Sequence, residues 1–283
     1  MYTLENEYLK VSAAAAGAEL KSVILKETGR ECLWQADPAY WGRSAPVLFP
    51  LVGAYRDNTS FYEGKAYHMG QHGFARDSVF SLVSQTEDTL VFSMTENEAT
   101  LEKYPFAFEL IITYRLIGRS IEVVWTVKSR EENRPIYFSI GAHPAFNCGM
   151  SGYRLGFESD RPLTVGILEK GVLTDRTKTL VPVDGTYPIT PELFDEDALV
   201  LENGQVHEVR ILDPEGGLVA AVKADAPVFG IWSPVGKKAP FVCLEPWYGR
   251  ADRADFNQKI EEREWGNTLL PGETFEKSYL ITF

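Results

Sequence analysis

Cysteine is scarce in this sequence, and basic side chains are outnumbered by acidic ones. The three cysteines among 283 residues, Cys32, Cys148 and Cys243, are too few and too widely spaced for a disulfide framework or a CxxC metal site. We therefore expect buried, reduced thiols, as is typical of a cytoplasmic protein. The net charge of −12 argues against a nucleic acid or an anionic membrane surface as partner, because phosphates bind to basic surfaces.

Long apolar runs are also missing. No uninterrupted apolar segment approaches the roughly 18 residues of a membrane-spanning helix. Residues 1–7 lack the basic start of a secretory signal, and the alanine run at 13–16 is too short for a signal core. These absences predict a cytoplasmic protein with no membrane partner.

Helix signals are sparse, because 23 glycines and 16 prolines interrupt most of the chain. Thr190 followed by Pro191 is typical of a helix start, with threonine as the cap, and predicts one short helix. Residues 97–104 predict another turn or two, which Pro105 ends. Long helices are therefore not expected.

Alternating apolar residues instead predict β-strands. Apolar side chains occupy every second position from Phe108 to Leu116, and again from Ile121 to Val127. Such patterns, separated by turns, are typical of antiparallel strands with one buried face. The predicted fold class is all-β, a single antiparallel sandwich domain over residues 1–283, since all-β domains often reach this length. Further strands are expected at 78–83, 89–94 and 275–283.

Metal and nucleophile motifs are weak. His68 and His72 have the spacing of two zinc ligands on a helix, but Gly70 and Gly73 disfavour that helix and no HExxH motif is present. No serine lies in a GxSxG motif, and no cysteine lies in a recognised nucleophile motif. We expect neither a metal site nor covalent catalysis.

Three loop-like segments combine polar side chains with glycine, proline or aromatic residues. They contain His72, His143 and Glu245, at 71–77, 141–147 and 241–249 respectively. An imidazole and a carboxylate can move protons together near pH 7, so the pattern indicates general acid–base chemistry. Plainer roles fit the same residue types: a structural histidine, a solvated glutamate at a strand end, and a surface ion pair for Arg43.

Aromatic residues add a hint about the ligand. Six tryptophans and 13 tyrosines are many for this length, and four of the tryptophans lie near the candidate loops: Trp34, Trp41, Trp232 and Trp247. The C–H faces of sugars stack on aromatic rings, although tryptophan in a β-sandwich is also a common core residue. The composition is compatible with a carbohydrate ligand.

Seven segments together resemble the aldose 1-epimerase (galactose mutarotase) family, most closely its short bacterial, LacX-like branch. They span nearly the whole chain, at 17–22, 33–35, 43–50, 72–76, 141–147, 244–247 and 270–273. The resemblance implies a large antiparallel β-supersandwich with one or two short helices. It also implies an enzyme that interconverts the α and β anomers of a free hexose without a cofactor or metal.

The resemblance implies roles for individual side chains. Glu245 would be the general base that takes the proton of the anomeric hydroxyl, and His143 would be the general acid that protonates the ring oxygen. This scheme requires an ionised carboxylate and a protonated imidazole. Four further residues are expected to contact the sugar: Arg43, His72, Asp197 and Trp247.

The sequence departs from the long branch of that family at several positions. These departures leave undecided which sugar is the substrate. Arg43 precedes serine, alanine and proline, whereas the long branch has a glycine- and asparagine-rich segment around its arginine. The substrate-binding aspartate of that branch has no clean counterpart, and Asp197 is the best candidate, with Asp195 close behind.

Three other functions share parts of this pattern. A hexose-6-phosphate 1-epimerase needs cations for the phosphate, for which the chain offers Arg43, Arg76, Lys237 and Lys238. A non-catalytic sugar-binding protein of the same fold would not need both His143 and Glu245. A retaining glycosidase needs two carboxyl groups about 5–5.5 Å apart, and only one is well placed. The expected partner is a small-molecule sugar, and the expected assembly is a monomer or homodimer.

Overall fold

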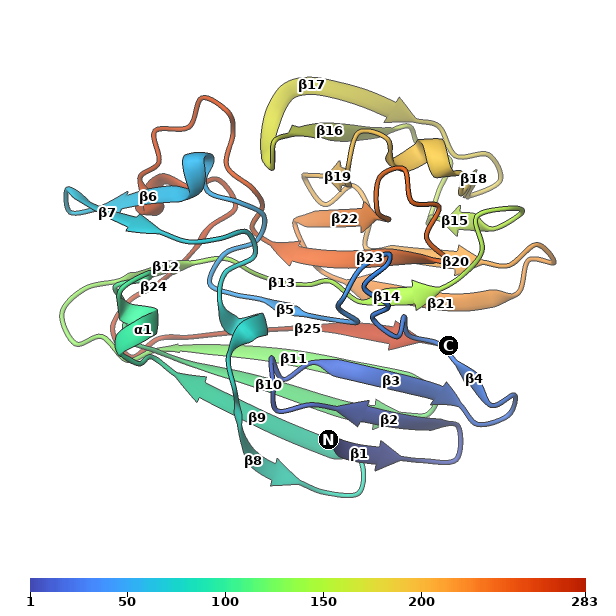
Figure 1. Cartoon of the computed structure of the whole chain (residues 1–283), viewed down its shortest axis with the longest axis horizontal. Helices are drawn as coiled ribbons and strands as arrows, with labels where there is room; N and C mark the ends of the chain where they lie inside the picture. The colour runs from blue at the N-terminus through green and yellow to red at the C-terminus, as the bar shows by residue number, and fades with distance from the viewer.

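The structure is a computed structural model that describes residues 1–283, and antiparallel strands make up most of it (Figure 1). The largest sheet has nine strands. In spatial order these are β18 (Thr186–Pro188), β15 (Arg154–Gly156), β20 (Glu208–Leu212), β21 (Leu218–Ala224), β25 (Thr274–Thr282), β11 (Ser120–Ser129), β10 (Phe108–Ile117), β9 (Thr89–Thr95) and β8 (Ser81–Gln85).

A second sheet of eight strands lies against part of the first and carries the candidate site. Its spatial order is β17 (Val172–Leu180), β16 (Leu163–Glu169), β19 (Leu199–Leu201), β22 (Val228–Trp232), β23 (Phe241–Tyr248), β13 (Ile140–Ala142) and β5 (Val47–Leu48), with β14 (Ala145–Asn147) also paired to β23. In Figure 1 these strands form the upper layer, above β25, β11 and β10. The stacked sheets confirm the predicted all-β antiparallel sandwich.

Smaller sheets complete the fold. Four N-terminal strands pair in sequence order: β1 (Tyr2–Glu5), β2 (Leu9–Ala13), β3 (Leu20–Leu25) and β4 (Arg30–Glu31). Two further pairs are β6 (Thr59–Tyr62) with β7 (Lys65–His68), and β12 (Ile136–Phe138) with β24 (Asn267–Leu269).

Helical structure is limited to short turns. The one α-helix, α1 (Glu98–Leu101), starts at Asn97, whose side chain accepts a hydrogen bond from the Thr100 N–H. The 3-10 turns are η1 (Arg56–Asn58), η2 (Ala75–Asp77), η3 (Pro191–Phe194) and η4 (Ile260–Glu262). The two predicted helical segments are thus α1 and η3. Pro191 opens η3 as predicted, but Thr190 forms no side-chain capping bond. No helix combines the length and the apolarity that crossing a bilayer requires.

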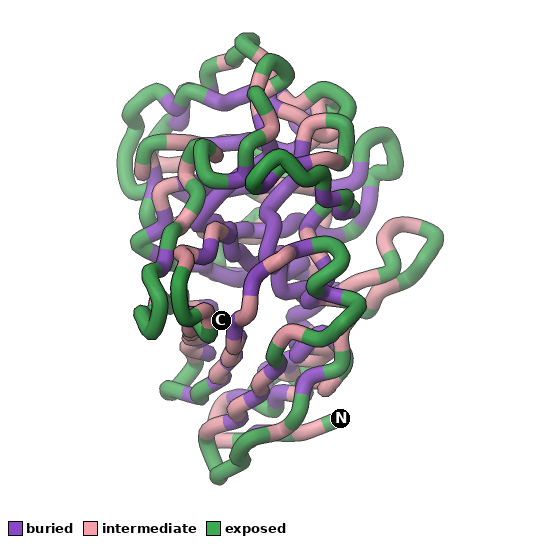
Figure 2. Tube along the Cα trace, turned by 90° about the vertical axis from the view of Figure 1, so that its left-hand side faces the viewer, coloured by how far each residue is buried: buried purple, intermediate pink, exposed green.

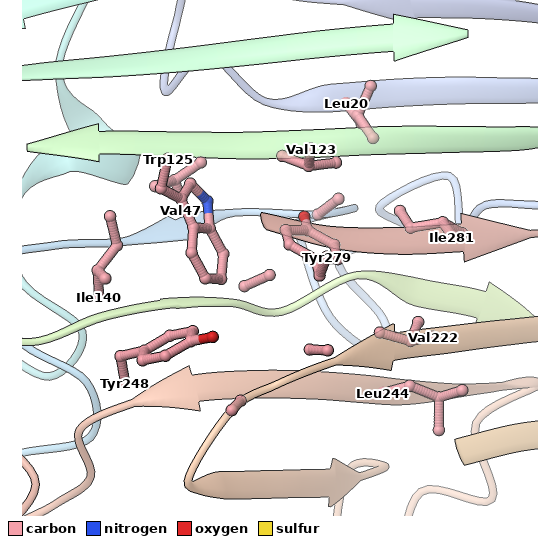
Figure 3. Close-up of a cluster of buried hydrophobic side chains, with 14 of the residues drawn as sticks. Leu20, Val47, Val123, Trp125, Ile140, Val222, Leu244, Tyr248, Tyr279 and Ile281 are labelled. Carbon is pink, nitrogen blue, oxygen red and sulfur yellow. The ribbon is translucent and has the colours of Figure 1, made fainter. Parts of the chain in front are cut away.

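The core lies between the two large sheets. Figure 3 shows Val123 and Trp125 of β11 and Tyr279 of β25 facing Leu244 and Tyr248 of β23. All alternating apolar residues predicted on β10 and β11 are buried, which confirms the face assigned to each strand. The buried positions follow the strand interiors, while the exposed ones gather at the peripheral turns (Figure 2).

Predicted strand bounds differ from the structure mainly at one place. The strand expected at 78–83 is β8, which begins at Ser81, because Val79 forms an isolated bridge with Ala16 and is not part of the ladder with β9. The strands expected at 89–94 and 275–283 are β9 and β25, each within a residue of its expected bounds.

Candidate active site

Strand β23 places Glu245 on the side of its sheet away from the main core. Side chains alternate between the faces of a strand, and Leu244 and Tyr248 belong to the core of Figure 3. Glu245 and Trp247 therefore point to the opposite face. Glu245 is only 1% exposed, and neither carboxylate oxygen has a hydrogen-bond partner. An ionisable group this buried, without a hydrogen bond, is costly to stability, which makes it a candidate functional residue.

Strand register brings His143 next to Glu245. Gly141 of β13 pairs with Trp247, and Ala145 of β14 pairs with Cys243. His143 lies in the short link between these strands, so the same antiparallel register puts it opposite Glu245. The His143 Nε2 and Glu245 Oε1 atoms are 3.4 Å apart. The predicted acid and base thus lie in contact.

Aromatic rings enclose the His143 imidazole. Trp41 stacks on it with a centroid distance of 4.7 Å and an interplanar angle of 26°. Trp232 meets it edge to face at 5.3 Å, and His72 does so at 5.5 Å. These contacts fix the orientation of the ring, and they exclude water from its faces.

His72 has a defined tautomer. Its Nδ1 accepts a hydrogen bond from the Gly53 N–H at 3.2 Å, so the neutral ring carries its proton on Nε2. Burial holds the pKa of His72 well below its usual 6.5, and the neighbouring His143 acts in the same direction. His72 is therefore a neutral hydrogen-bond donor at physiological pH.

These side chains line a cavity of about 230 Å³. Five of the six predicted site residues lie on its wall: His72, His143, Asp197, Glu245 and Trp247. The cavity is lined by residues of the eight-stranded sheet and of the loops around it. Three other lining residues were noted in the sequence outside the expected site, namely Trp41 and Trp232 as nearby aromatics and Arg76 as a cation for a phosphate. Gln71 and Arg250 also line the cavity, and no site role was expected for them.

Arg43 is the one predicted site residue that is not among the lining residues. Its guanidinium contacts the Asp77 carboxylate at 2.7 Å, which is the surface ion pair considered as its plainer role. The arginine on the cavity wall is Arg76. Its Nε is buried without a hydrogen-bond partner, and one terminal nitrogen donates to the Gln71 carbonyl at 2.7 Å.

A family model described as aldose 1-epimerase matches residues 1–282 of this sequence. The chain belongs to the aldose 1-epimerase family. It is 34% identical to the chromosomal protein LacX of Lactococcus lactis subsp. lactis over 295 residues, which cover 99% of this chain and 98% of that protein. The predicted resemblance to the LacX-like branch is confirmed.

Solved structures support the same assignment. A galactose mutarotase related enzyme from Lactobacillus acidophilus superposes with a TM-score of 0.94 at 34% identity, covering 99% of this chain and 96% of that one. A galactose mutarotase-like protein from Lactobacillus casei gives a TM-score of 0.93 at 30% identity, covering 100% and 99%. The architecture is therefore that of the aldose 1-epimerase family throughout.

Burial opposes charge on both His143 and Glu245. It lowers the pKa of His143 to about 3, and the guanidinium groups of Arg76 and Arg43 act in the same direction. It raises the pKa of Glu245 well above its usual 4.5, and the nearby Asp197 carboxylate adds to this effect. The expected ionised carboxylate and protonated imidazole are therefore not the form that burial favours. Burial therefore favours a proton on Glu245 over a proton on His143.

Asp197 reaches the cavity from the turn after η3. Its backbone φ of 71° lies in the left-handed region, and one carboxylate oxygen accepts a hydrogen bond from the Ala198 N–H at 2.9 Å. Asp195, the second candidate from the sequence, is not on the cavity wall. The structure thus places Asp197, rather than Asp195, at the site.

Arg250 is a lining residue whose guanidinium is held by neighbouring protein groups. Its three guanidinium nitrogens bind Glu202, Glu264 and the carbonyl of Ala251, and its side chain is only 3% exposed. Arginine is usually exposed, so this burial could not be predicted from the residue type. The role of Arg250 is to hold Ala251, a lining residue, in place.

The two histidines with zinc-like spacing do not share a helix. His68 ends strand β7 and contacts Thr59, whereas His72 has a φ of 68° outside any helix. One other set of potential ligands lies close together, formed by His143, Cys243 and Glu245.

Trp247 packs directly on two glycines. A Cβ added to Gly230 would lie 2.4 Å from the indole Cζ2, and one added to Gly141 would lie 2.7 Å from its Cδ1. Both distances are too short for real contacts. The absence of a side chain at these positions lets the indole lie flat on the sheet beside Glu245.

Gly230→Ala is expected to displace the Trp247 indole and lower the free energy of unfolding by about 1–3 kcal/mol. Denaturant unfolding followed by tryptophan fluorescence measures this change. Gly216→Ala is no suitable control because φ there is positive, but Gly42→Ala has open space around its Cβ. Equal stabilities of the Gly230 and Gly42 variants would contradict the packing described.

Proposed function

We propose that this protein is an aldose 1-epimerase that interconverts the α and β anomers of a free hexose. The observation that carries the proposal is the 3.4 Å contact between His143 Nε2 and Glu245 Oε1 on the wall of a small cavity. An acid and a base side by side can serve two oxygens of one small ring, which is what anomerisation requires.

Ring opening moves two protons. Glu245 takes the proton of the anomeric hydroxyl, His143 gives a proton to the ring oxygen, and the bond between C1 and that oxygen breaks. The open aldehyde rotates about its C1–C2 bond, and the ring closes with the two roles reversed. The sugar is changed only in its anomeric configuration, and both side chains return to their starting states.

This direction of transfer requires the shared proton to lie on His143 when the sugar is bound. Burial favours its position on Glu245 in the free pocket. A sugar hydroxyl that donates a hydrogen bond to the Glu245 carboxylate stabilises its ionised form and opposes the effect of burial. The bound sugar thereby prepares the pair for the reaction.

The other lining groups suit the remaining hydroxyls of a sugar. His72 offers a neutral Nε2–H donor, since its Nδ1 is already engaged. Asp197 offers a carboxylate as acceptor, and Trp247 has a buried indole N–H without a partner. Arg76 has an unpartnered Nε–H. Several fixed donors and one acceptor around aromatic walls are typical of a monosaccharide site.

The pH profile of kcat/KM is expected to lack the acidic limb of an ordinary histidine. The active pair holds one proton, so activity falls when His143 gains a second proton near its pKa of about 3. It falls again at high pH, when the pair loses its only proton from the raised pKa of Glu245. Kinetics should therefore stay flat from pH 6.5 down to about 5. A fall in kcat/KM below about pH 6.5 would contradict the lowering of the His143 pKa by burial.

Polarimetry or NMR on freshly dissolved α-galactose and α-glucose tests the proposal. The purified protein is expected to accelerate approach to anomeric equilibrium in proportion to its concentration. If no common aldose equilibrates faster with the protein than without it, the proposal is wrong.

A second candidate, a hexose-6-phosphate 1-epimerase, is favoured by one observation. Arg76 on the cavity wall has an unpartnered Nε, and Arg43 is close enough to affect the same histidines. The guanidinium of Arg76 on the cavity wall suits an anionic substituent. Arg43 lies outside the cavity, and both arginines contact the Asp77 carboxylate. Lys237 binds the carbonyls of Ala39 and Tyr40. A higher kcat/KM for glucose 6-phosphate than for glucose would favour this candidate, and the reverse would favour a free hexose.

A further inference from the structure

Cys243 is a buried thiol that the proposed reaction does not use. It lies two residues before Glu245 on β23, so the two side chains leave the same face of the strand. Cys243 is fully buried and forms no disulfide. One ligand atom each from His143, Cys243 and Glu245 lies within 4.8 Å of the other two.

The spacing and chemistry of these atoms suit zinc. Two nitrogen or oxygen ligands about 2.1 Å from a tetrahedral zinc ion lie about 3.4 Å apart, and His143 Nε2 and Glu245 Oε1 already have this separation. The Cys243 sulfur lies within 4.8 Å of both atoms, so a small side-chain shift brings it to its usual zinc distance of about 2.3 Å. A nitrogen, a sulfur and an oxygen ligand favour zinc over magnesium or calcium, which prefer oxygen alone.

Two further observations point to a ligand at this place. Both carboxylate oxygens of Glu245 are buried without a hydrogen-bond partner, and the ion-pair contact of Oε1 is with His143, the second proposed ligand. The cavity borders both His143 and Glu245, which leaves a fourth coordination position open to water.

We propose that His143, Cys243 and Glu245 form a binding site for a single zinc ion, which excludes the sugar and blocks the acid–base pair. Binding releases two protons to solvent, one from the Cys243 thiol and one shared by the pair. The thiolate and the carboxylate then balance the two positive charges of zinc. Zinc binding does not depend on the proposed function, whereas inhibition rests on it.

Isothermal titration calorimetry with zinc alone tests the site in the full-length protein. One ion is expected to bind per chain, with two protons released, as measured in buffers of different ionisation enthalpy. Cys243→Ser should weaken binding at least tenfold and release one proton fewer. Cys32→Ser is the matched control, since Cys32 is also buried but lies outside the cluster, and it should bind zinc as the wild type does.

Cobalt(II) provides an independent readout. The wild type should show a thiolate-to-cobalt charge-transfer band that Cys243→Ser lacks, and Cys243→Ala serves in the same way if the serine variant does not fold. Absence of zinc binding in the wild type, or equal affinity in the wild type and the Cys243 variants, would overturn the proposal.

Competition between zinc and sugar tests whether the two ligands exclude each other, and this test does not require catalytic activity. Zinc should weaken sugar binding in the wild type at least tenfold more than in Cys243→Ser, as measured by tryptophan fluorescence. Equal weakening in both proteins would overturn the exclusion of sugar by zinc. Failure of the anomerase assay alone would leave the zinc titration intact and would overturn only the proposed function.

Discussion

Glu245→Gln is expected to slow anomerisation by at least about 100-fold and to leave sugar affinity nearly unchanged. General acid–base groups contribute about 10²- to 10⁴-fold to rate, and the glutamine amide keeps the size of the side chain but cannot accept the proton. Rates come from polarimetry of freshly dissolved sugar. Affinity comes from tryptophan fluorescence, because three tryptophans line the cavity: Trp41, Trp232 and Trp247.

Glu261→Gln provides the matched control. Glu261 lies in η4, is exposed and is not a lining residue, so the same chemical change there should leave the rate unaltered. A Glu245→Gln variant with more than a tenth of the wild-type rate would show that this carboxyl is not the base. A non-catalytic sugar-binding protein would instead show no anomerisation even as the wild type.

His143→Asn is the second change with a large expected effect, again about 10²- to 10⁴-fold in kcat. Asparagine cannot supply a proton to the ring oxygen, and it removes the ring on which Trp41 stacks. We expect a smaller change in KM than in kcat, since His72, Asp197 and Arg76 still line the cavity. Steady-state polarimetry over a range of sugar concentrations measures both values.

His68→Asn is the control for this substitution. His68 is an exposed residue at the end of β7, where it contacts Thr59. Its replacement should leave both constants within experimental error of the wild type. If His143→Asn retained most of the wild-type kcat while His72→Asn lost it, the acid would have to be reassigned to His72.

The strand pattern could be predicted from the sequence where one face of a strand is buried and the other is not. Strands β10 and β11 alternate for this reason, and their faces were predicted residue by residue. Strand β23 is buried at every position, so alternation does not reveal which of its residues face the cavity. The register of β13 and β14 against β23 is equally hidden, although it sets the distance between His143 and Glu245.

Some features of the candidate site could be predicted from the sequence and others could not, for physical reasons. His143 and Glu245 were recognised by chemical type and by resemblance, and the fold brings them together. Arg43 was expected to contact the sugar from the resemblance, whereas the structure places Arg76 on the cavity wall. The pKa directions could not be predicted, because they depend on burial that arises from segments far apart in the chain.

The glycines of this site have a similar explanation. Gly230 and Gly141 sit on the strands that flank β23, and each is opposite a residue of the site in the sheet. The sequence marks them only as glycines within strands. The structure shows that Trp247 packs on both glycines, where any side chain would clash with its indole.

The most direct test of the account is a double-mutant cycle for anomerisation with Glu245→Gln, His143→Asn and the combined variant. When two residues act as one unit, the first substitution already removes most of their joint contribution to the rate, and the second adds little further loss. The combined variant is therefore expected to be no more than about threefold slower than the slower single variant. If the two losses instead multiply, His143 and Glu245 act independently, and the paired acid–base site described here is wrong.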